Sequence, residues 1–491
     1  MKLSELLSEL TFYEELNAPI DNVEIKNVEM DSREVGDGDL FICIDGFTVD
    51  GHKFAEQAVQ NGASAILAEK DVSVPVPTVK VANTSRALPI VAGKFFQYPT
   101  KKLPLIGVTG TNGKTTVTYL LESIFNQVSR KTGLIGTIQM KIGEDIHPVK
   151  NTTPDALFLQ RTFKQMHDEK VEQAIMEVSS HALDLGRVHG CDFDIAVFTN
   201  ISQDHLDYHR NMEDYLHAKS LLFSQLGNSF DEENKKYAVI NLDDPHADFL
   251  IRSTAQQVVT YGCEHEAHVM AEEINLEVTR TEFTLKTPVG SVRINSRLVG
   301  TFNIYNMLAA SAAAIAANVP LSEIKDALEK VKGVSGRFEP VEGNHDFAVI
   351  VDYAHTPDSL ENVLQTIKGF AKQKVYVVVG CGGDRDKTKR PLMADVAMNY
   401  ADHVIFTSDN PRTEDSGEIL SDMTDGLEDN HYEVIEGRKE AINMAVKLAD
   451  TDDIILIAGK GHETYQEIGG TRYDFDDRVE AKKAIDKKGT L

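Results

Sequence analysis

A glycine-rich segment near residue 110 is typical of a phosphate-binding loop. It runs from Gly107 to Thr116 (GVTGTNGKTT), between a short apolar run and a helical pattern. Glycines let backbone N–H groups close around phosphate oxygens, and the helix N-terminus adds the positive end of its dipole. Lys114 is expected to contact the terminal phosphates and Thr115 to hold magnesium. The strict loop pattern has glycine where this chain has Val108, so the sequence predicts a variant loop.

Two further polar segments follow apolar runs of the same region. They are Glu177 to His181 (EVSSH) and Asn200 to His209 (NISQDHLDYH). We expect both at the sheet edge that carries the phosphate loop. Magnesium prefers oxygen ligands beside phosphates, so Glu177 is a suitable ligand, whereas the imidazole of His205 is a less usual one. Taken alone, each histidine of these segments is more often a structural hydrogen-bonding group.

The C-terminal third predicts a parallel sheet with a binding edge. Apolar runs at 348–351, 374–379, 403–407 and 453–458 alternate with helical stretches, which indicates βαβ units. The polar clusters DYAHTP, GCGGDRDKTKR, SDNPR and GKGHE follow these runs. Ligands of open α/β sheets bind beyond the carboxyl ends of the strands. The four clusters therefore predict a binding role for this edge.

The rest of the chain predicts the elements that position these segments. Strands are expected at 103–108, 174–178, 195–199 and 237–241, and a helix is expected after the phosphate loop. Residues 98–104 resemble a linker, and a second boundary is expected near 333–340. Residues 1–16 are read as a helix, and the alanine-rich run 307–319 as a close-packed helix too short to span a bilayer.

Composition bounds the class of protein. A chain of 491 residues predicts about two to four domains. Its 50 basic and 77 acidic residues give a net charge of -27, which argues against binding to nucleic acid or to an anionic membrane. Four cysteines without a CxxC pair, together with an N-terminus that has no basic and apolar leader, favour a reducing cytoplasm.

At this point the chain resembles the Mur ligases of peptidoglycan synthesis. The resemblance rests on motifs whose order and spacing match along nearly the whole length: GTNGKTT, EVSSHAL, NISQDHLDYH, HAKSLLF, the run from Thr301 to Asn306, SGRFE, DYAHTP and GDRDKTKRP. Within the family, the segments Asp409–Arg412 and Gly459–Glu463 resemble the member that adds meso-diaminopimelate to UDP-N-acetylmuramoyl-L-alanyl-D-glutamate.

The resemblance implies an α/β chain of three domains. Residues 1–100 would bind the UDP end of the substrate, residues 101–336 would form a central P-loop, parallel-sheet ATPase domain, and residues 337–491 would form a Rossmann-like domain for the amino acid. The implied reaction is amide ligation through an acyl phosphate. ATP phosphorylates the substrate carboxylate, magnesium offsets charge between the two anions, and the amine of diaminopimelate then attacks.

The resemblance also assigns the nucleotide and metal sites. The residues implied in ATP binding are Gly110, Thr111, Asn112, Gly113, Lys114, Thr115, Thr116, Asn303, Arg337, Asp352 and His355. Magnesium would be held by Thr115, Glu177, His205 and Lys219. Taken alone, Lys219 in HAKSLLF is typical of a surface lysine, but the family carbamylates this position with carbon dioxide, which turns a cation into a metal-binding anion. Lys114, Glu177, His205 and Lys219 are thus the implied catalytic residues.

Two groups of residues are implied in binding the other substrates. The UDP-sugar peptide would be contacted by Ser32, Asn151, Thr152, Thr153, Ser179 and Arg187. The family usually has glutamine where this chain has Leu185, which puts one polar contact in doubt. The amino acid would be contacted by Arg385, Asp409, Asn410, Pro411, Arg412, Gly459 and Glu463.

Arg412 is the residue expected to select diaminopimelate over lysine. Its planar guanidinium can pair bidentately with the extra carboxylate, and lysine would leave it unpaired. Alternatives within the superfamily are a lysine-adding enzyme, a D-Ala-D-Ala-adding enzyme and folylpolyglutamate synthase; a nucleotide-binding regulator without catalysis is an alternative of another class. The expected protein acts as a cytoplasmic monomer.

Overall fold

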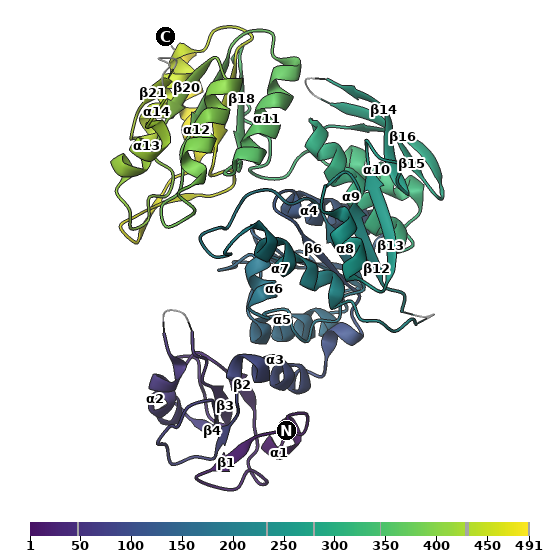
Figure 1. Cartoon of the computed structure of the whole chain (residues 1–491), viewed down its shortest axis with the longest axis vertical. Coiled ribbons are helices and arrows are strands. Elements are labelled where there is room, and N and C mark those ends of the chain that lie inside the picture. Colours follow the sequence, from purple (N-terminus) through teal and green to yellow (C-terminus); the bar gives the residue numbers. More distant parts are fainter. Residues whose placement is uncertain (47–48, 232–233, 278–279, 344, 428–431, 490–491) are drawn as a thin grey trace. The chain divides into compact units, whose positions relative to one another are not determined.

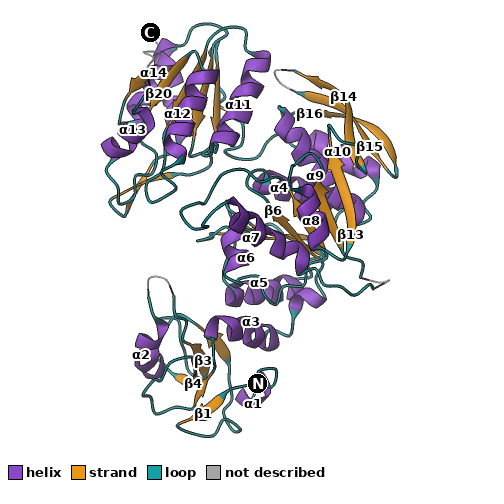
Figure 2. Cartoon of the chain, viewed as in Figure 1, coloured by secondary structure: helices purple, strands orange, loops and turns teal. Residues whose placement is uncertain are grey.

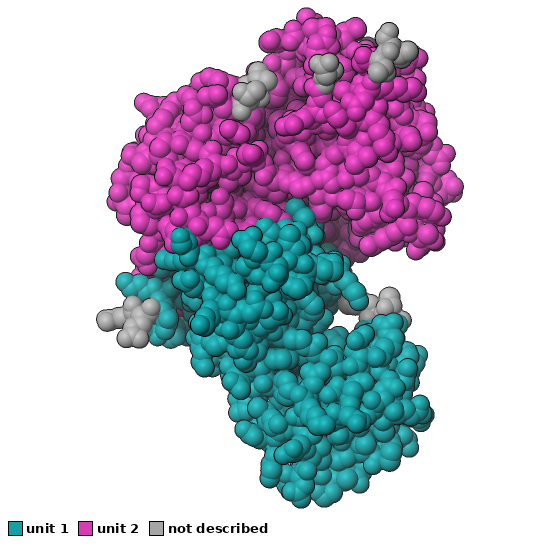
Figure 3. Space-filling view, turned by 180° about the vertical axis from the view of Figure 1, so that it is seen from behind, with its two compact units in different colours: residues 1–108, 129–196, 221–237 teal, residues 109–128, 197–220, 238–491 magenta. Residues whose placement is uncertain are grey.

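The computed structural model describes residues 1–46, 49–231, 234–277, 280–343, 345–427 and 432–489. Its contacts group the chain into two compact units, which Figure 3 colours separately. Unit 1 comprises residues 1–108, 129–196 and 221–237, and unit 2 comprises residues 109–128, 197–220 and 238–491. Helices and strands alternate through both units (Figures 1 and 2), which confirms the predicted α/β class.

The first hundred residues of unit 1 form a five-stranded sheet in the order β1-β5-β4-β3-β2. Neighbours from β2 to β5 are parallel, and β1 runs antiparallel to β5. Apolar cores lie on both faces, one around Leu40 and Leu67 and the other around Phe41 and Ile66. The elements are α1 (Leu3–Leu6), β1 (Glu14–Leu16), β2 (Asn27–Glu29), β3 (Asp39–Ile42), η1 (Gly51–Phe54), α2 (Ala55–Gln60), β4 (Ala63–Ala68), β5 (Thr78–Lys80), α3 (Thr84–Phe95) and η2 (Pro99–Lys101).

The predicted helix over residues 1–16 is wrong beyond its first turn. Helix α1 ends at Leu6, and Glu14–Leu16 instead pair with Thr78–Lys80 as strand β1. Phe12, between the two elements, is 88% exposed. A continuous helix would forgo this strand pairing.

The rest of unit 1 carries strands in the order β6-β10-β7-β8-β9. Strand β10 is parallel to both β6 and β7, and the β7-β8-β9 strands are antiparallel. The elements are β6 (Leu105–Thr109), β7 (Thr132–Ile135), β8 (Met140–Ile142), β9 (Asp145–His147), α5 (Ala156–Asp168), β10 (Gln173–Glu177) and α6 (Ser180–Asp184). The predicted strand at 103–108 is confirmed as β6, and that at 174–178 as β10.

Unit 2 begins with the helix of the predicted phosphate loop and with a second set of strands in the order β16-β15-β14-β13-β12-β11. The predicted strands at 195–199 and 237–241 are confirmed as β11 and β12, and the alanine-rich run is confirmed as part of buried helix α9. The elements, of which β11, α7 and β12 have some of their residues in unit 1, are α4 (Lys114–Gln127), β11 (Ile195–Phe198), α7 (Met212–Ser224), β12 (Tyr237–Asn241), α8 (Ala247–Ser253), β13 (Gln257–Gly262), β14 (Val269–Leu276), β15 (Thr281–Thr287), β16 (Gly290–Ser296), α9 (Thr301–Ala316) and α10 (Leu321–Lys330).

The C-terminal part of unit 2 is a doubly wound sheet in the order β17-β18-β22-β19-β20-β21. All neighbours from β18 onward are parallel, and helices cover both faces. The elements are β17 (Glu339–Pro340), β18 (Ala348–Asp352), α11 (Pro357–Phe370), β19 (Val375–Val379), α12 (Lys389–Tyr400), β20 (His403–Phe406), α13 (Ser416–Thr424), β21 (Tyr432–Val434), α14 (Arg438–Leu448), β22 (Ile454–Ala458), β23 (Tyr465–Ile468), β24 (Thr471–Asp474) and α15 (Asp477–Lys488). The four predicted parallel strands are thereby confirmed.

Candidate functional site

The predicted phosphate loop joins the end of β6 to the start of α4. Gly110 and Gly113 have φ angles of +147° and +88°, and a Cβ atom on Gly110 would lie 1.8 Å from the hydroxyl of Thr199. These conformations and the close packing require glycine. The Lys114 Nζ atom donates to the carbonyls of Gly110 and Thr111 at 2.9 and 2.8 Å. The local sequence thus forms a loop that precedes a helix N-terminus, as predicted.

Residues that follow strand β11 form hydrogen bonds with the backbone of this loop. The backbone N–H groups of Thr111 and Asn112 donate to the backbone and side-chain oxygens of Asn200, at 2.8 and 3.0 Å. The hydroxyl of Thr199 donates to the Asn112 carbonyl at 2.6 Å. The NISQDH segment, which the sequence paired with this loop, therefore fixes the loop's backbone.

Lys219 is buried beneath the phosphate loop. It lies on α7 with 1% of its surface exposed, and its Nζ atom donates to the Gly110 carbonyl at 2.8 Å and lies 4.3 Å from the centre of the Tyr215 ring. Burial lowers the pKa of Lys219 well below its usual value, and the nearby Lys114 cation lowers it further, whereas Asp204 acts in the opposite direction. The interpretation of Lys219 as a surface lysine is wrong.

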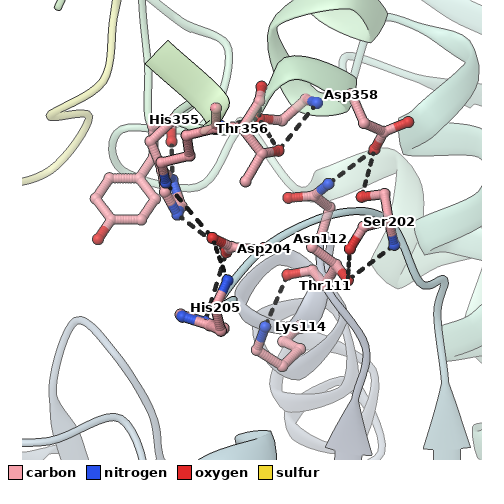
Figure 4. A network of polar contacts seen from close by, with 12 residues as sticks. Thr111, Asn112, Lys114, Ser202, Asp204, His205, His355, Thr356 and Asp358 are labelled. Carbon is pink, nitrogen blue, oxygen red and sulfur yellow. Dashed lines mark hydrogen bonds and ion pairs between the residues drawn. The ribbon is translucent and has the colours of Figure 1, made fainter. Parts of the chain in front are cut away.

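Several positive or protonatable side chains lie close to the carboxylate of Asp204 (Figure 4). Its carboxylate lies 3.4 Å from Lys389, 3.5 Å from His205 and 3.7 Å from His355. Burial alone would raise the pKa of Asp204, but His355, Lys389 and His205 together hold it well below its usual value. The structure thus brings two predicted site residues, His205 and His355, to one carboxylate that the sequence reading had not selected.

Asp358 forms a second link between the phosphate loop and the C-terminal sheet region. Its Oδ2 atom accepts hydrogen bonds from Asn112 at 2.9 Å and from Ser202 at 3.2 Å, as Figure 4 shows. Burial raises the pKa of this carboxyl, and the two donors oppose the rise. Asp358 was missed because it follows the DYAHTP motif and is also an ordinary acidic residue in the first turn of helix α11.

A cleft of about 380 Å³ opens beside the loop. Of the predicted nucleotide contacts, Asn112, Gly113, Thr116, Arg337 and Asp352 line it. Arg337 donates to the Thr115 hydroxyl at 3.2 Å and lies over the Tyr353 ring. The sequence did not select several other lining residues: Asp243, Asp244, Tyr305, Asn306 and Asp358. Asn306 lies within the TFNIYN run that supported the family resemblance, so that motif could have identified it.

Asn303 and Asp352 are held by bonds to the backbone of their own surroundings. Asn303 Nδ2 donates to the Val299 carbonyl at 2.9 Å, and its Oδ1 accepts from Asn306 at 3.2 Å. Asp352 accepts from the Phe338 N–H at 2.6 Å, and burial raises its pKa. Both side chains are buried, and these contacts fix their orientations.

The predicted amino-acid contacts meet at the ends of β20 and β22. Asn410 Nδ2 donates to Glu463 Oε2 at 2.8 Å, and a Cβ atom on Gly459 would lie 2.5 Å from an Asp409 oxygen. Arg412 adopts a positive φ of +53° and donates to the Gly383 carbonyl at 2.5 Å.

Pro411 and Arg385, two further residues of the predicted amino-acid site, differ in burial. Pro411 is buried between the predicted contacts Asn410 and Arg412. Arg385 is exposed and donates to its neighbour's carbonyl, that of Asp384. These bonds do not bring Arg385 into the cluster formed by Asn410 and Glu463.

In unit 1, the predicted muramoyl-peptide contacts surround Glu177. This carboxylate is fully buried and accepts from the Thr137 N–H and hydroxyl, both at 2.9 Å. The Thr137 hydroxyl lies 3.0 Å from that of Thr152, and the Thr153 hydroxyl donates to the Glu177 carbonyl at 2.9 Å. Ser179 and Arg187 also contact Thr153.

The remaining predicted residues of unit 1 lie apart from these bonds. Asn151 is exposed, and Leu185 is half-buried at the end of α6. Ser32 lines a separate cavity of about 850 Å³ and donates to Gln57 at 3.2 Å. The lining of this cavity mixes cations and carboxylates: Arg33 pairs with Asp31 and Arg161 pairs with Glu29, each at 2.6 Å.

The chemistry of the predicted metal ligands fits magnesium if Lys219 carries a carbamate. The described ranges contain no group of three His, Cys, Asp or Glu side chains that could hold a metal ion. The predicted set offers the Thr115 hydroxyl, the Glu177 carboxylate and the His205 imidazole, and a carbamate on Lys219 would add a further anionic oxygen donor. Magnesium prefers such oxygen ligands.

Two other expectations have outcomes here. The four cysteines are free, and Cys43 and Cys381 are buried. In the part of the chain that the structure describes, no helix has the length and apolar character needed to cross a membrane.

Comparison with known families gives three adjacent matches. Residues 24–98 match the model of the Mur ligase family, catalytic domain, residues 108–314 that of the Mur ligase middle domain, and residues 336–461 that of the Mur ligase, glutamate ligase domain.

Individual proteins match over the whole length. The UDP-N-acetylmuramoyl-L-alanyl-D-glutamate–2,6-diaminopimelate ligase of Oceanobacillus iheyensis is 62% identical and covers 100% of both chains, and that of Bacillus velezensis is 56% identical over 99% of both. A solved structure of an enzyme with this name is 36% identical, with a TM-score of 0.70, covering 100% of this chain and 99% of the other. This chain therefore belongs to the Mur ligase family.

Proposed function

We propose that this chain is the ATP-dependent ligase that joins meso-2,6-diaminopimelate to UDP-N-acetylmuramoyl-L-alanyl-D-glutamate in peptidoglycan precursor synthesis. Relatives of this name cover the full chain at more than 50% identity. The structural observation that carries the proposal is the contact between Asn410 and Glu463, which joins the two segments expected to recognise diaminopimelate. The lysine-adding alternative is disfavoured because Arg412, two residues after Asn410, offers a guanidinium that can pair with the distal carboxylate of diaminopimelate, a group that lysine lacks.

The reaction proceeds in two steps. An oxygen of the glutamyl carboxylate attacks the γ-phosphorus of ATP, ADP leaves, and an acyl phosphate forms. The amine of diaminopimelate then attacks the acyl carbon, inorganic phosphate leaves with the electrons of the broken C–O bond, and the nitrogen releases protons to give the amide. Lys114 now donates hydrogen bonds to two loop carbonyls. With ATP bound, it would contact the transferring phosphoryl group instead and supply positive charge to it.

The nucleotide is proposed to occupy the cleft of about 380 Å³, with its phosphates at Gly110–Thr116 and its adenosine end near Asn303, Arg337, Asp352 and His355. Magnesium would be held by Thr115, Glu177, His205 and Lys219, and when bound it would offset the charge between the carboxylate and the γ-phosphate.

We also propose that Lys219 reacts with carbon dioxide. Its depressed pKa favours the neutral amine. The lone pair of the amine nitrogen attacks the carbon of CO₂, and the nitrogen then loses one proton to give a carbamate. Contact with the Gly110 carbonyl places this nitrogen at the phosphate loop. The modification would replace a cation that repels a metal ion by an anion that attracts one.

The UDP-sugar peptide is assigned to Ser32 at one end and to Asn151, Thr152, Thr153, Ser179 and Arg187 at the other. The amino acid is assigned to Arg385, Asp409, Asn410, Pro411, Arg412, Gly459 and Glu463. The domain boundaries near residues 100 and 336, the cytoplasmic location and the monomeric state remain parts of the proposal. Four free cysteines support a reducing compartment.

A ligation assay tests the proposal. The protein is incubated with ATP, magnesium, the UDP-dipeptide and, in parallel, diaminopimelate, lysine or D-alanyl-D-alanine, and ADP release and product mass are followed. We expect product with diaminopimelate at the highest kcat/KM. Efficient use of lysine or D-alanyl-D-alanine instead would contradict the assignment. ADP release that needs neither acceptor nor amine would favour a nucleotide-binding regulator.

A further inference from the structure

Lys460 lies fully buried within the predicted amino-acid cluster. It follows Gly459 at the end of β22 and has 0% of its surface exposed. Its Nζ atom donates to Asn410 Oδ1 at 3.0 Å and to Glu463 Oε2 at 2.9 Å, and it lies 5.4 Å from the centre of the Tyr465 ring. A lysine is almost never fully buried unless it is paired. Lys460 has such a partner in Glu463.

Lys460, Asn410 and Glu463 form a closed triangle of hydrogen bonds. The third side is the bond from Asn410 Nδ2 to the same Glu463 oxygen, at 2.8 Å. Asn410 Oδ1 also accepts the Glu467 N–H at 2.9 Å. Each side chain of the triangle is therefore oriented by the other two. Lys460 thus orients Asn410 and Glu463, two of the residues that we assign to the amino acid, although Lys460 itself is not among the assigned contacts.

Lys460 also sets the charge of this region. Burial alone would raise the pKa of Asp409, but Lys460, Arg438 and Arg412, in decreasing order, hold it below its usual value. Arg438, the other fully buried cation nearby, is paired with Asp477 at 2.7 Å, and both side chains are 0% exposed. Lys460 is thus the buried cation that directly offsets Glu463.

We propose that Lys460 is a specificity-determining residue, because it neutralises Glu463 and so prevents a lone ammonium group from binding well. The amino acid must then also bring the carboxylate that Arg412 recognises, which diaminopimelate has at its far end and lysine lacks. Without Lys460, the uncompensated carboxylate of Glu463 would attract the ammonium of lysine, while its loosened orientation would weaken the fit of diaminopimelate. This inference rests on the proposed function.

The test compares Lys460→Met with wild type, measuring kcat and KM for diaminopimelate, lysine and ATP. We expect the ratio of kcat/KM for diaminopimelate to that for lysine to fall at least about tenfold, since breaking a buried charge pair changes affinity by that much or more. The KM for ATP should stay unchanged. Lys482→Met, on an exposed position of α15, is the matched control and should keep the wild-type ratio.

Two more variants separate charge from structure. Lys460→Gln keeps a donor without the charge and should lower the ratio in the same direction, even where Lys460→Met folds poorly by thermal melting. Lys460→Arg keeps the charge and should retain the preference for diaminopimelate while overall activity drops. If the ratio stays within about twofold of wild type in both neutral variants while both rates fall together, Lys460 is only structural and the inference is wrong. A wild-type protein that does not prefer diaminopimelate would contradict the proposed function itself.

Discussion

Two buried lysines, Lys219 and Lys460, lie in opposite chemical environments. Both expose 1% or less of their surface. The hydrogen-bond acceptor of Lys219 is a backbone carbonyl, that of Gly110, and a second cation, Lys114, lies nearby. Lys460 instead donates to a carboxylate and to an amide oxygen. The first environment disfavours the ammonium form of Lys219. The second gives Lys460 an oppositely charged hydrogen-bond partner.

The comparison shows that burial of a lysine does not by itself reveal its role. A buried amine without a carboxylate partner is ready to react, because its neutral form carries a lone pair. A buried ammonium with a carboxylate partner can orient side chains and set local charge. The identity of the acceptor decides between the two roles, so substitutions at the two positions should have different consequences.

The largest expected effect is on catalysis at Lys219. Lys219→Ala should lower kcat by at least about 10²–10³-fold, because the proposed carbamate would be lost from the metal site. Added short carboxylates, such as acetate or formate, should restore part of the activity in steady-state assays. Lys482→Ala, an exposed lysine, serves as the control. Near-normal turnover of Lys219→Ala would show that the carbamate is not needed.

The next effect is expected on selectivity at Arg412, beside the Lys460 triangle. Arg412→Ala should weaken discrimination between diaminopimelate and lysine by about 2–5 kcal/mol, or about 30-fold to several-thousand-fold, since the distal carboxylate loses its partner. Competition assays with both amino acids measure this.

The exposed Lys482 provides the reference for Arg412, and Lys482→Ala should leave discrimination unchanged. If Arg412→Ala discriminates as well as wild type, then Arg412 does not read the carboxylate. The pattern should also differ from that of Lys460→Met, because removal of Arg412 reduces use of diaminopimelate without improving use of lysine.

Substitution of the two lysines by methionine should change the free energy of unfolding in opposite directions. Lys460→Met leaves the partly buried Glu463, 14% exposed, without its cation and should lower the free energy of unfolding by about 3 kcal/mol. Lys219→Met, in buffer free of carbon dioxide, removes a buried amine without a carboxylate partner and should raise it by about 1–3 kcal/mol. Denaturant unfolding of both variants and of wild type measures the difference. Equal losses at both positions would contradict the contrast between the two environments.

The smallest effect concerns pH. The folded-state pKa of Lys219 is depressed, so below the unfolded-state value of about 10.4 the unfolded chain binds more protons at this residue than the folded chain. The penalty from Lys219 is therefore absent above that value and grows as the pH falls toward the folded-state pKa. In carbon-dioxide-free buffer, the stability advantage of Lys219→Met should shrink between pH 7 and about pH 10. An advantage that does not vary with pH would mean that Lys219 keeps its proton in the folded state.

Local sequence was sufficient for the elements with strong periodicity. The strands β18, β19, β20 and β22 follow from short continuous apolar runs, and the loop that precedes α4 follows from glycine at positive φ. The N-terminal helix failed because strand pairing with Thr78–Lys80 outweighed a weak helical pattern. The sequence did not predict Asp204 and Asp358 as site residues, because only the side chains packed around a carboxylate distinguish it from other acidic residues.

By itself, the sequence determined the order of the strands along the chain, the phosphate loop and the motifs that identify the family, because these depend on residues close in sequence. Only the tertiary structure decided that Lys219 and Lys460 are both buried and that one faces a carbonyl while the other faces a carboxylate. Their partners lie 109 and 3 residues away, in one case on a different element and in the other within one loop. Burial and pairing depend on how distant segments pack, and that packing sets the charge state on which the chemistry depends.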